Sequence, residues 1–242
     1  MNKIKRFAVA GCVGLLVLGI ASNSYADRRS YVWTYEYMTM PKGMAEVEYY
    51  LTAAEPDAGK SNINTWKHQL EIEYGITTRW DIAMYQVWTQ KNTASSSTFG
   101  YDGFKIRTRY RIGEKGQFFL DPLLYFEYIR DDDLSKPHVG EVKLILAKDL
   151  GDFNVSYNQI VKRNLEEEGE TNHEYAAGVN YRFSPFFALG VESKGSYSER
   201  KYSVGPTIAW SYKKIFVALG AVFGLNEKTD DVQTRMIVGM LF

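Results

Sequence analysis

The chain has 242 residues, and its 29 lysines and arginines balance 29 aspartates and glutamates, so the formal charge is zero at pH 7. A balanced charge gives no indication of nucleic-acid binding. After residue 26 no apolar run approaches the roughly 18 residues of a membrane helix, which excludes a helical membrane bundle. Aromatic residues make up 15% of the chain, with 18 tyrosines and only 6 prolines, a composition that favours β-strands.

Residues 1–26 are predicted to be a cleaved secretory signal peptide. Three basic residues precede an apolar run at 7–20, and small residues around Ala26 mark the cleavage site. The run is shorter than the roughly 20 residues that span a bilayer, so a retained anchor is less favoured. The residues before Cys12 resemble a lipoprotein processing box, but most of the apolar run follows that cysteine. Cleavage after Ala26 would remove this only cysteine and leave no thiol for a disulfide, a nucleophile or a metal ligand.

Residues 27–43 alternate apolar and polar side chains like a strand from Tyr31 onward. Counting this stretch among the strands predicted below would give an odd number, thirteen, which does not suit a bacterial barrel. We therefore expect 27–43 to be a lead-in that packs inside or under the domain formed by residues 44–242.

From Met44 onward the chain is a series of segments about ten residues long, in which apolar and polar residues alternate and which turns separate. The predicted strands are 44–53, 66–76, 80–90, 102–112, 117–129, 138–148, 152–163, 173–182, 186–197, 201–211, 215–225 and 232–242. Short links at 77–79, 113–116, 149–151, 183–185 and 212–214 alternate with longer ones at 54–65, 91–101, 130–137, 164–172 and 226–231, with the short link 198–200 as the exception. Short periplasmic turns alternating with longer extracellular loops are typical of a transmembrane barrel.

The strands are amphipathic with a period of two. In 102–112, Phe104 and Ile106 share one face while Arg107 and Arg109 share the other. A soluble sandwich buries its apolar face, whereas a membrane barrel turns that face to lipid and lines its lumen with the polar one. Aromatic residues collect at strand ends beside the short turns, as in the girdle at a membrane interface: Tyr74, Trp80, Tyr110, Phe118, Phe153, Tyr181, Phe187, Tyr212 and Phe242. We therefore predict an all-β fold, a single antiparallel transmembrane β-barrel of about twelve strands.

The final strand ends on Phe242, with Met240 and Val238 at every second position before it. The positions between them, such as Gly239 and Arg235, are predicted to form a small or polar inner face. This pattern resembles the assembly signal of Gram-negative outer-membrane β-barrels. The resemblance implies a place in the cell outer membrane among lipid and lipopolysaccharide, recognition by the barrel-assembly machinery, and closure of the barrel by this strand.

A narrower resemblance lies in residues 33–48, Trp-Thr-Tyr-Glu-Tyr-Met-Thr-Met-Pro-Lys-Gly-Met-Ala-Glu-Val-Glu. The stretch is similar to the opening of small uncharacterised outer-membrane proteins akin to the barrels of the MetA pathway of phenol degradation. This resemblance implies the same barrel fold. It carries no settled activity that could be transferred residue by residue.

Charges of opposite sign are predicted to line the lumen in separate groups. The basic ladder comprises Lys105, Arg107, Arg109 and Arg111; the acidic patch comprises Glu46, Glu48, Glu71, Glu73, Asp81, Asp121 and Glu127. In a water-filled lumen such groups select solutes by charge, which predicts a channel for the passive or facilitated diffusion of small hydrophilic solutes. Charges that pair across strands would instead close the lumen, which predicts a structural or partner-binding barrel. Both interpretations remain open from the sequence.

The sequence gives no basis for an enzyme, a metal site or a cofactor. A barrel phospholipase needs a histidine and a serine on one strand face, and none of His68, His138 and His173 has a serine two positions away. The acidic runs 131–133 and 166–168 lack the spacing of a calcium loop and are predicted to be solvated loops. A lipid-modifying enzyme is therefore the least favoured of the three functions.

Overall fold

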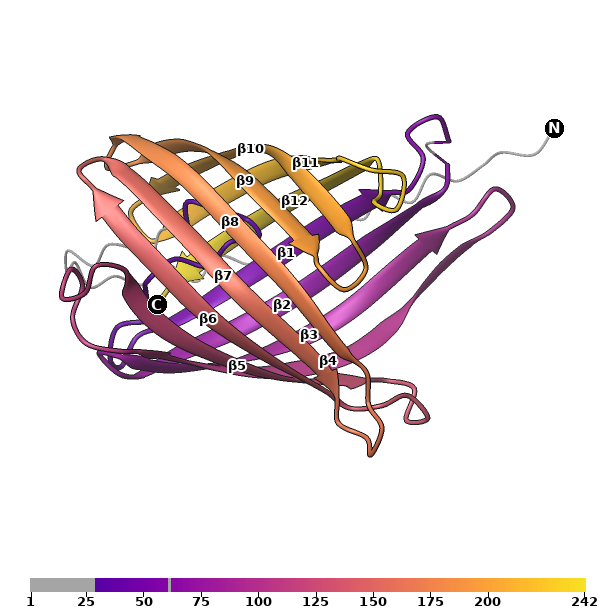
Figure 1. Cartoon of the computed structure of the whole chain (residues 1–242), viewed down its shortest axis with the longest axis horizontal. Helices are drawn as coiled ribbons and strands as arrows, with labels where there is room; N and C mark the ends of the chain where they lie inside the picture. The colour runs from indigo at the N-terminus through magenta and orange to yellow at the C-terminus, as the bar shows by residue number, and fades with distance from the viewer. Residues whose placement is uncertain (1–28, 61) are drawn as a thin grey trace.

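The structure, a computed structural model, describes residues 29–60 and 62–242; the predicted signal peptide, 1–26, lies outside them. In this part of the chain, twelve strands form one closed antiparallel barrel in which each strand pairs with its neighbours along the chain and β12 pairs with β1 (Figure 1). The strands are β1 (Ala45–Glu55), β2 (Asn64–Thr77), β3 (Trp80–Asn92), β4 (Ser97–Arg111), β5 (Asp121–Asp131), β6 (Val139–Leu150), β7 (Phe153–Asn164), β8 (Thr171–Ser184), β9 (Phe187–Ser196), β10 (Lys201–Tyr212), β11 (Ile215–Gly224) and β12 (Val232–Leu241). The prediction of an all-β, twelve-stranded barrel is confirmed. Among the described residues, no helix is long and apolar enough to cross a membrane.

The links divide into a short-turn end and a long-loop end, on the left and right of Figure 1. Two links differ most from their predicted bounds. The link predicted at 113–116 spans 112–120, because the Asp121 carboxylate accepts the N–H of Gly116 at 2.8 Å and holds the chain in a loop before β5 begins. The loop predicted at 91–101 shrinks to 93–96, because Asn92 and Ser97 bond to each other and extend the β3–β4 hairpin.

A bulge in β4 keeps aromatic side chains on the outer face. Asp102 is the extra residue between Tyr101 and Gly103, which pair with consecutive residues of β3. Gly103 has a φ of 118°, and a Cβ there would collide with the carbonyl oxygen of Arg130, so this position requires glycine. Because the bulge shifts the alternation by one residue, Tyr101 and Phe104 both lie on the outside of the barrel.

The two faces of the barrel have opposite character. On the outside, Ile72 is 54% exposed and Ile106 is 50% exposed. Their chain neighbours Glu71 and Arg107 point inward and are fully buried. The apolar outer face and charged inner face follow the alternation predicted from the sequence.

The inner face of β11 and of the C-terminal half of β12 is an apolar sector rather than a polar one. Phe216, Ile237 and Leu241 are buried there, so the predicted small or polar inner face of the last strand is wrong at Ile237 and Leu241. These side chains are apolar because Val32 and Met40 of the N-terminal segment pack against them from inside the barrel. This part of the lumen is a packed core.

Candidate functional site

Residues 29–43, hereafter the lead-in segment, cross the lumen and join the sheet only through a bridge between Lys42 and Gly75. The carboxylate of Glu192 on β9 accepts three consecutive backbone N–H groups at 2.7 to 2.8 Å, those of residues 32–34. Hydrogen bonds from backbone N–H groups to a carboxylate are stronger than those between neutral groups. Glu192 therefore anchors the segment to one wall of the barrel.

Further contacts tie the segment to opposite walls. On β7, the Asn158 side chain accepts the backbone N–H of Tyr35 at 2.6 Å and donates to its carbonyl at 2.9 Å. On β3, Asp81 accepts the N–H of Met40 at 3.0 Å. Gly75 on β2 permits the close approach, since a Cβ there would collide with the carbonyl oxygen of Met40. The segment thus spans the lumen as an internal strap.

A buried ion-pair network lies on the β2–β4 wall. Arg107 lies 2.7 Å from Glu71 and also pairs with Glu73, while Arg109 pairs with Glu73 and lies 2.8 Å from Asp81. All five side chains are at most 2% exposed. Buried charges persist only when opposite charges and hydrogen bonds satisfy them. The predicted basic and acidic groups therefore neutralise each other here.

Ala83 makes the network possible. In register it lies between Glu73 on β2 and Arg107 on β4, and all three point inward. Its methyl group leaves room for the guanidinium to reach across β3 to a strand that β4 does not touch. The spacing along the chain gives no sign of this contact.

The other two members of the predicted ladder lie apart from the network. Lys105 pairs with Glu127 at 3.1 Å and borders a cavity. Arg111, at the short-turn end, donates to Thr39 Oγ1 at 3.0 Å and to the carbonyl of Thr78. The four residues of the ladder thus follow one another on one strand face, but only Arg107 and Arg109 share the same ion-pair network.

The remaining predicted acidic residues also differ in their surroundings. Glu48 accepts a hydrogen bond from Nε of Arg29 at 2.9 Å, which ties the start of the lead-in segment to β1. Glu46 is buried on the same strand. Asp121 anchors the β4–β5 link and borders the cavity at the short-turn end.

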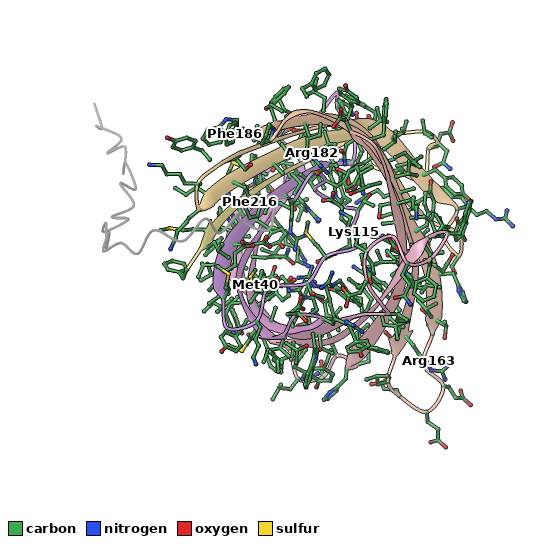
Figure 2. All side chains as sticks on the ribbon, turned by 90° about the vertical axis from the view of Figure 1, so that its left-hand side faces the viewer. Met40, Lys115, Arg163, Arg182, Phe186 and Phe216 are labelled. Carbon is green, nitrogen blue, oxygen red and sulfur yellow. The ribbon has the colours of Figure 1, made fainter. Side chains whose placement is uncertain are left out.

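Two cavities enter the barrel on opposite sides of the lead-in segment. The outer cavity, about 350 Å³, opens towards the long loops, and the inner cavity, about 820 Å³, opens towards the short turns. The outer cavity is bordered by Trp33, Tyr35, Lys105, Glu127, Glu141, Lys143, Lys162, Glu174, Lys194, Lys201, Gln233 and Arg235, and the inner one by Glu36, Tyr37, Thr39, Lys115, Asp121, Asp149, Asn154 and Arg182, among others. Figure 2 looks into the short-turn end and shows Met40 and Phe216 inside the ring of strands, with Arg163, near the end of β7, at the far end of the barrel.

Most charges of the outer cavity come from strands other than those that carry the predicted basic ladder and acidic patch. Lys143 lies 2.8 Å from Glu141, and Lys162 lies 3.3 Å from Glu141 and 2.8 Å from Glu174. Each occupies an inward position of an alternating strand, so the alternation alone could have predicted that these side chains face the lumen. No strand carries more than two of them, so they form no ladder in the sequence.

The histidines and acidic groups form no metal site. Among the described residues, no group of three or more His, Cys, Asp or Glu side chains could hold a metal ion. His68 and Tyr49 share a hydrogen bond at 2.6 Å on the outer face, and His138 shares a hydrogen bond with Tyr128.

Solved structures share this architecture at low sequence identity. The COG4313 outer membrane channel from Pseudomonas putida F1 has a TM-score of 0.64 and 9% identity, over 88% of this chain and 100% of that one. The KdgM porin has a TM-score of 0.56 and the NanC porin one of 0.51, both at 11% identity over 81% of this chain and 98% of theirs. The fold is that of an outer-membrane β-barrel.

The chain matches no protein-family model, and no curated protein matches it in sequence. The narrower resemblance to the MetA-pathway barrels therefore stays a prediction. The outer-membrane barrel fold rests on the strand pairing and on the structural likenesses.

Proposed function

We propose that this chain is an outer-membrane channel for the passive or facilitated diffusion of small hydrophilic solutes through a charged lumen. The observation that carries the proposal is the pair of cavities with charged side chains on their walls, about 350 and 820 Å³, that enter one barrel from its two ends and both border the lead-in segment. Twelve strands enclose more space than the eight of a barrel that side chains fill. The lead-in segment then forms the constriction between two vestibules.

Charge selectivity in this proposal comes from the cavity walls rather than from the basic ladder as a unit. Lys105 borders the outer cavity and contributes directly. Arg107 and Arg109 are buried in ion pairs and stabilise the β2–β4 wall of the lumen.

Single-channel recording of the refolded protein in a planar bilayer, with the reversal potential under a salt gradient, tests the proposal. We expect discrete conductance steps with a defined selectivity. Tyr35→Ala should raise the conductance, because Tyr35 borders the outer cavity where the lead-in segment crosses. Tyr212→Ala is the control, since Tyr212 is exposed on the outer face. Equal conductance of Tyr35→Ala and the wild type would show that the constriction lies elsewhere.

A second candidate function is a closed barrel with a salt-bridged interior that stiffens the membrane or presents loops to partners. The lead-in segment and the buried network of Arg107 and Arg109 favour it. A silent bilayer, together with a heat-modifiable folded band on a gel, would support this function and overturn the channel.

We infer further that the protein lies in the outer membrane after removal of its signal peptide. The apolar outer face, where Ile72 and Ile106 are exposed, supports contact with lipid, and the long loops are suited to contact with lipopolysaccharide. Phe242 is proposed to be recognised by the barrel-assembly machinery. Recovery of the protein in the inner-membrane or soluble fraction of cells would contradict this location. No enzymatic, cofactor or nucleic-acid role forms part of the proposal.

A further inference from the structure

In the described part of the chain, two cationic side chains on the wall of the outer cavity, Lys194 and Arg235, lack the carboxylate partner that the other cationic side chains there have. Four lysines there pair with a carboxylate at 2.6 to 3.1 Å: Lys105, Lys143, Lys162 and Lys201. Within the described residues, Lys194 and Arg235 have no carboxylate within ion-pair distance. Both are partly buried and both border the cavity.

Neutral groups hold these two side chains in place. Nζ of Lys194 donates to Oε1 of Gln233 at 2.6 Å. Nε of Arg235 donates to Oγ1 of Thr52 at 2.8 Å, and its Nη1 donates to the carbonyl of Val32 at 3.0 Å. Such acceptors fix the geometry of a cation but bring no opposite charge into contact with it.

The two charges converge although their strands are not neighbours. Lys194 is on β9 and Arg235 on β12, with two strands between them in the sheet. Nζ of Lys194 lies 5.3 Å and Cζ of Arg235 lies 5.5 Å from the centroid of the Trp33 ring. The ring attracts both cations without neutralising either. Like charges gathered around one ring repel each other, and an anion bound beside both relieves the repulsion.

We propose that Lys194 and Arg235 form a binding site for a small hydrophilic carboxylate in the outer cavity. A guanidinium presents a planar fork that matches the two oxygens of a carboxylate, and an ammonium adds a second charge-assisted hydrogen bond. A cavity of about 350 Å³ is the size of a small-molecule site. The hydroxyl groups of Ser196, Ser203 and Thr229 on its wall suit a hydroxylated solute.

As a statement about the transported solute, this site rests on the proposed channel function. Binding itself does not require conduction, so it is measured separately. Calorimetric titration of the refolded protein in detergent with gluconate, and with sorbitol as the neutral six-carbon counterpart, tests the site directly. The titration is performed whether or not the bilayer conducts, which separates failure of the site from failure of the channel.

We expect gluconate to bind and sorbitol to give no saturable heat. Lys194→Gln and Arg235→Gln should each weaken gluconate binding by about tenfold, because each removes one charge-assisted contact. Lys136→Gln is the matched control: it makes the same change at an exposed lysine that pairs with Asp131 outside the lumen, and its affinity should equal that of the wild type.

Three results would overturn the site. These are no gluconate binding to the wild type, equal affinity for sorbitol and gluconate, and undiminished gluconate affinity in the Lys194→Gln/Arg235→Gln double variant. The comparison of the two solutes on the wild type needs no variant, so it decides the question even if a substitution prevents folding. A heat-modifiable band identifies the variants that fold.

Discussion

At the scale of single residues, Arg109 shows why the lumenal charges are structural on one wall. Its guanidinium pairs with both Glu73 and Asp81, and it is 2% exposed. Removing one member of such a network leaves the others buried without their partner. The stabilising effect belongs to the network as a whole, so the loss should exceed that of an exposed pair.

We predict that Arg109→Gln lowers the free energy of unfolding by about 3 to 5 kcal/mol, the usual effect of breaking a buried ion pair. Urea unfolding in detergent, followed by the heat-modifiable band, measures it. Lys136→Gln breaks an exposed pair with Asp131 and should cost at most about 1 kcal/mol. Equal urea midpoints for the two variants would mean that the network does not stabilise the barrel.

A pH dependence is expected from Glu36 of the lead-in segment. Its carboxylate accepts the N–H of Ser30 at 2.8 Å, and burial raises its pKa to about 6 from the usual 4.5. The folded state therefore holds this proton more tightly than the unfolded state, so the contribution of Glu36 to stability is highest below pH 4.5 and falls as the pH rises towards 6. The shift corresponds to about 2 kcal/mol.

Substituting Glu36→Gln removes this titration, so the variant's stability should change less between pH 4.5 and 6 than that of the wild type. Urea midpoints on either side of that window measure the difference. Parallel pH profiles for variant and wild type would show that Glu36 does not titrate in this range.

At the scale of elements, the lead-in segment alternates like a strand but uses its backbone differently. The N–H groups of residues 32–35 and of Met40 donate hydrogen bonds to side chains of the wall, at Glu192, Asn158 and Asp81, rather than to the backbone of a neighbouring strand. A segment held by side chains can be released by changing one of them, whereas a strand in the sheet cannot.

We predict that Glu192→Ala loosens the lead-in segment, because it removes the acceptor of three backbone N–H groups. A larger or noisier single-channel conductance and faster proteolysis near residues 32–34 are the expected results. Glu167→Ala, at an exposed position of the β7–β8 loop, should change neither property. An unchanged conductance and digestion pattern in Glu192→Ala would show that the remaining contacts suffice to hold the segment.

At the scale of the whole molecule, pairing of β12 with β1 closes the barrel and leaves no free sheet edge. The backbone N–H of Phe242 donates to the carbonyl of Ala45 at 2.8 Å, and the Phe242 ring is exposed at the short-turn end. The ring adds little to the packed interior. Its contribution is therefore expected during assembly rather than in the finished barrel.

We predict that Phe242→Ala reduces the amount of folded protein in the outer membrane of cells but not the yield of refolding in detergent. Quantifying the heat-modifiable band from both sources tests this. Phe119→Ala, at an exposed aromatic residue of the β4–β5 link, should leave both amounts unchanged. An equal reduction in cells and in detergent would assign Phe242 a structural role instead.

The sequence by itself determined the strands, their number and the direction of most side chains. Strand alternation is local, since residues such as Ile106 and Arg107 must point to opposite faces wherever the strand lies. Turn residues and strand length are equally local, which is why the twelve strands and the closed barrel could be predicted. Errors occurred where a side chain meets a partner outside its own strand: the Asp121 carboxylate accepts a hydrogen bond from the preceding link, and Ile237 packs against the lead-in segment.

Only the tertiary structure decided which charges meet. Arg107 reaches Glu73 across Ala83, and Lys194 and Arg235 converge on Trp33 from strands far apart in the chain. These contacts depend on the curvature of the closed sheet and on the path of the lead-in segment through it. Neither is encoded in the spacing of residues along one strand, because a charge on the inner face meets its partner on another strand.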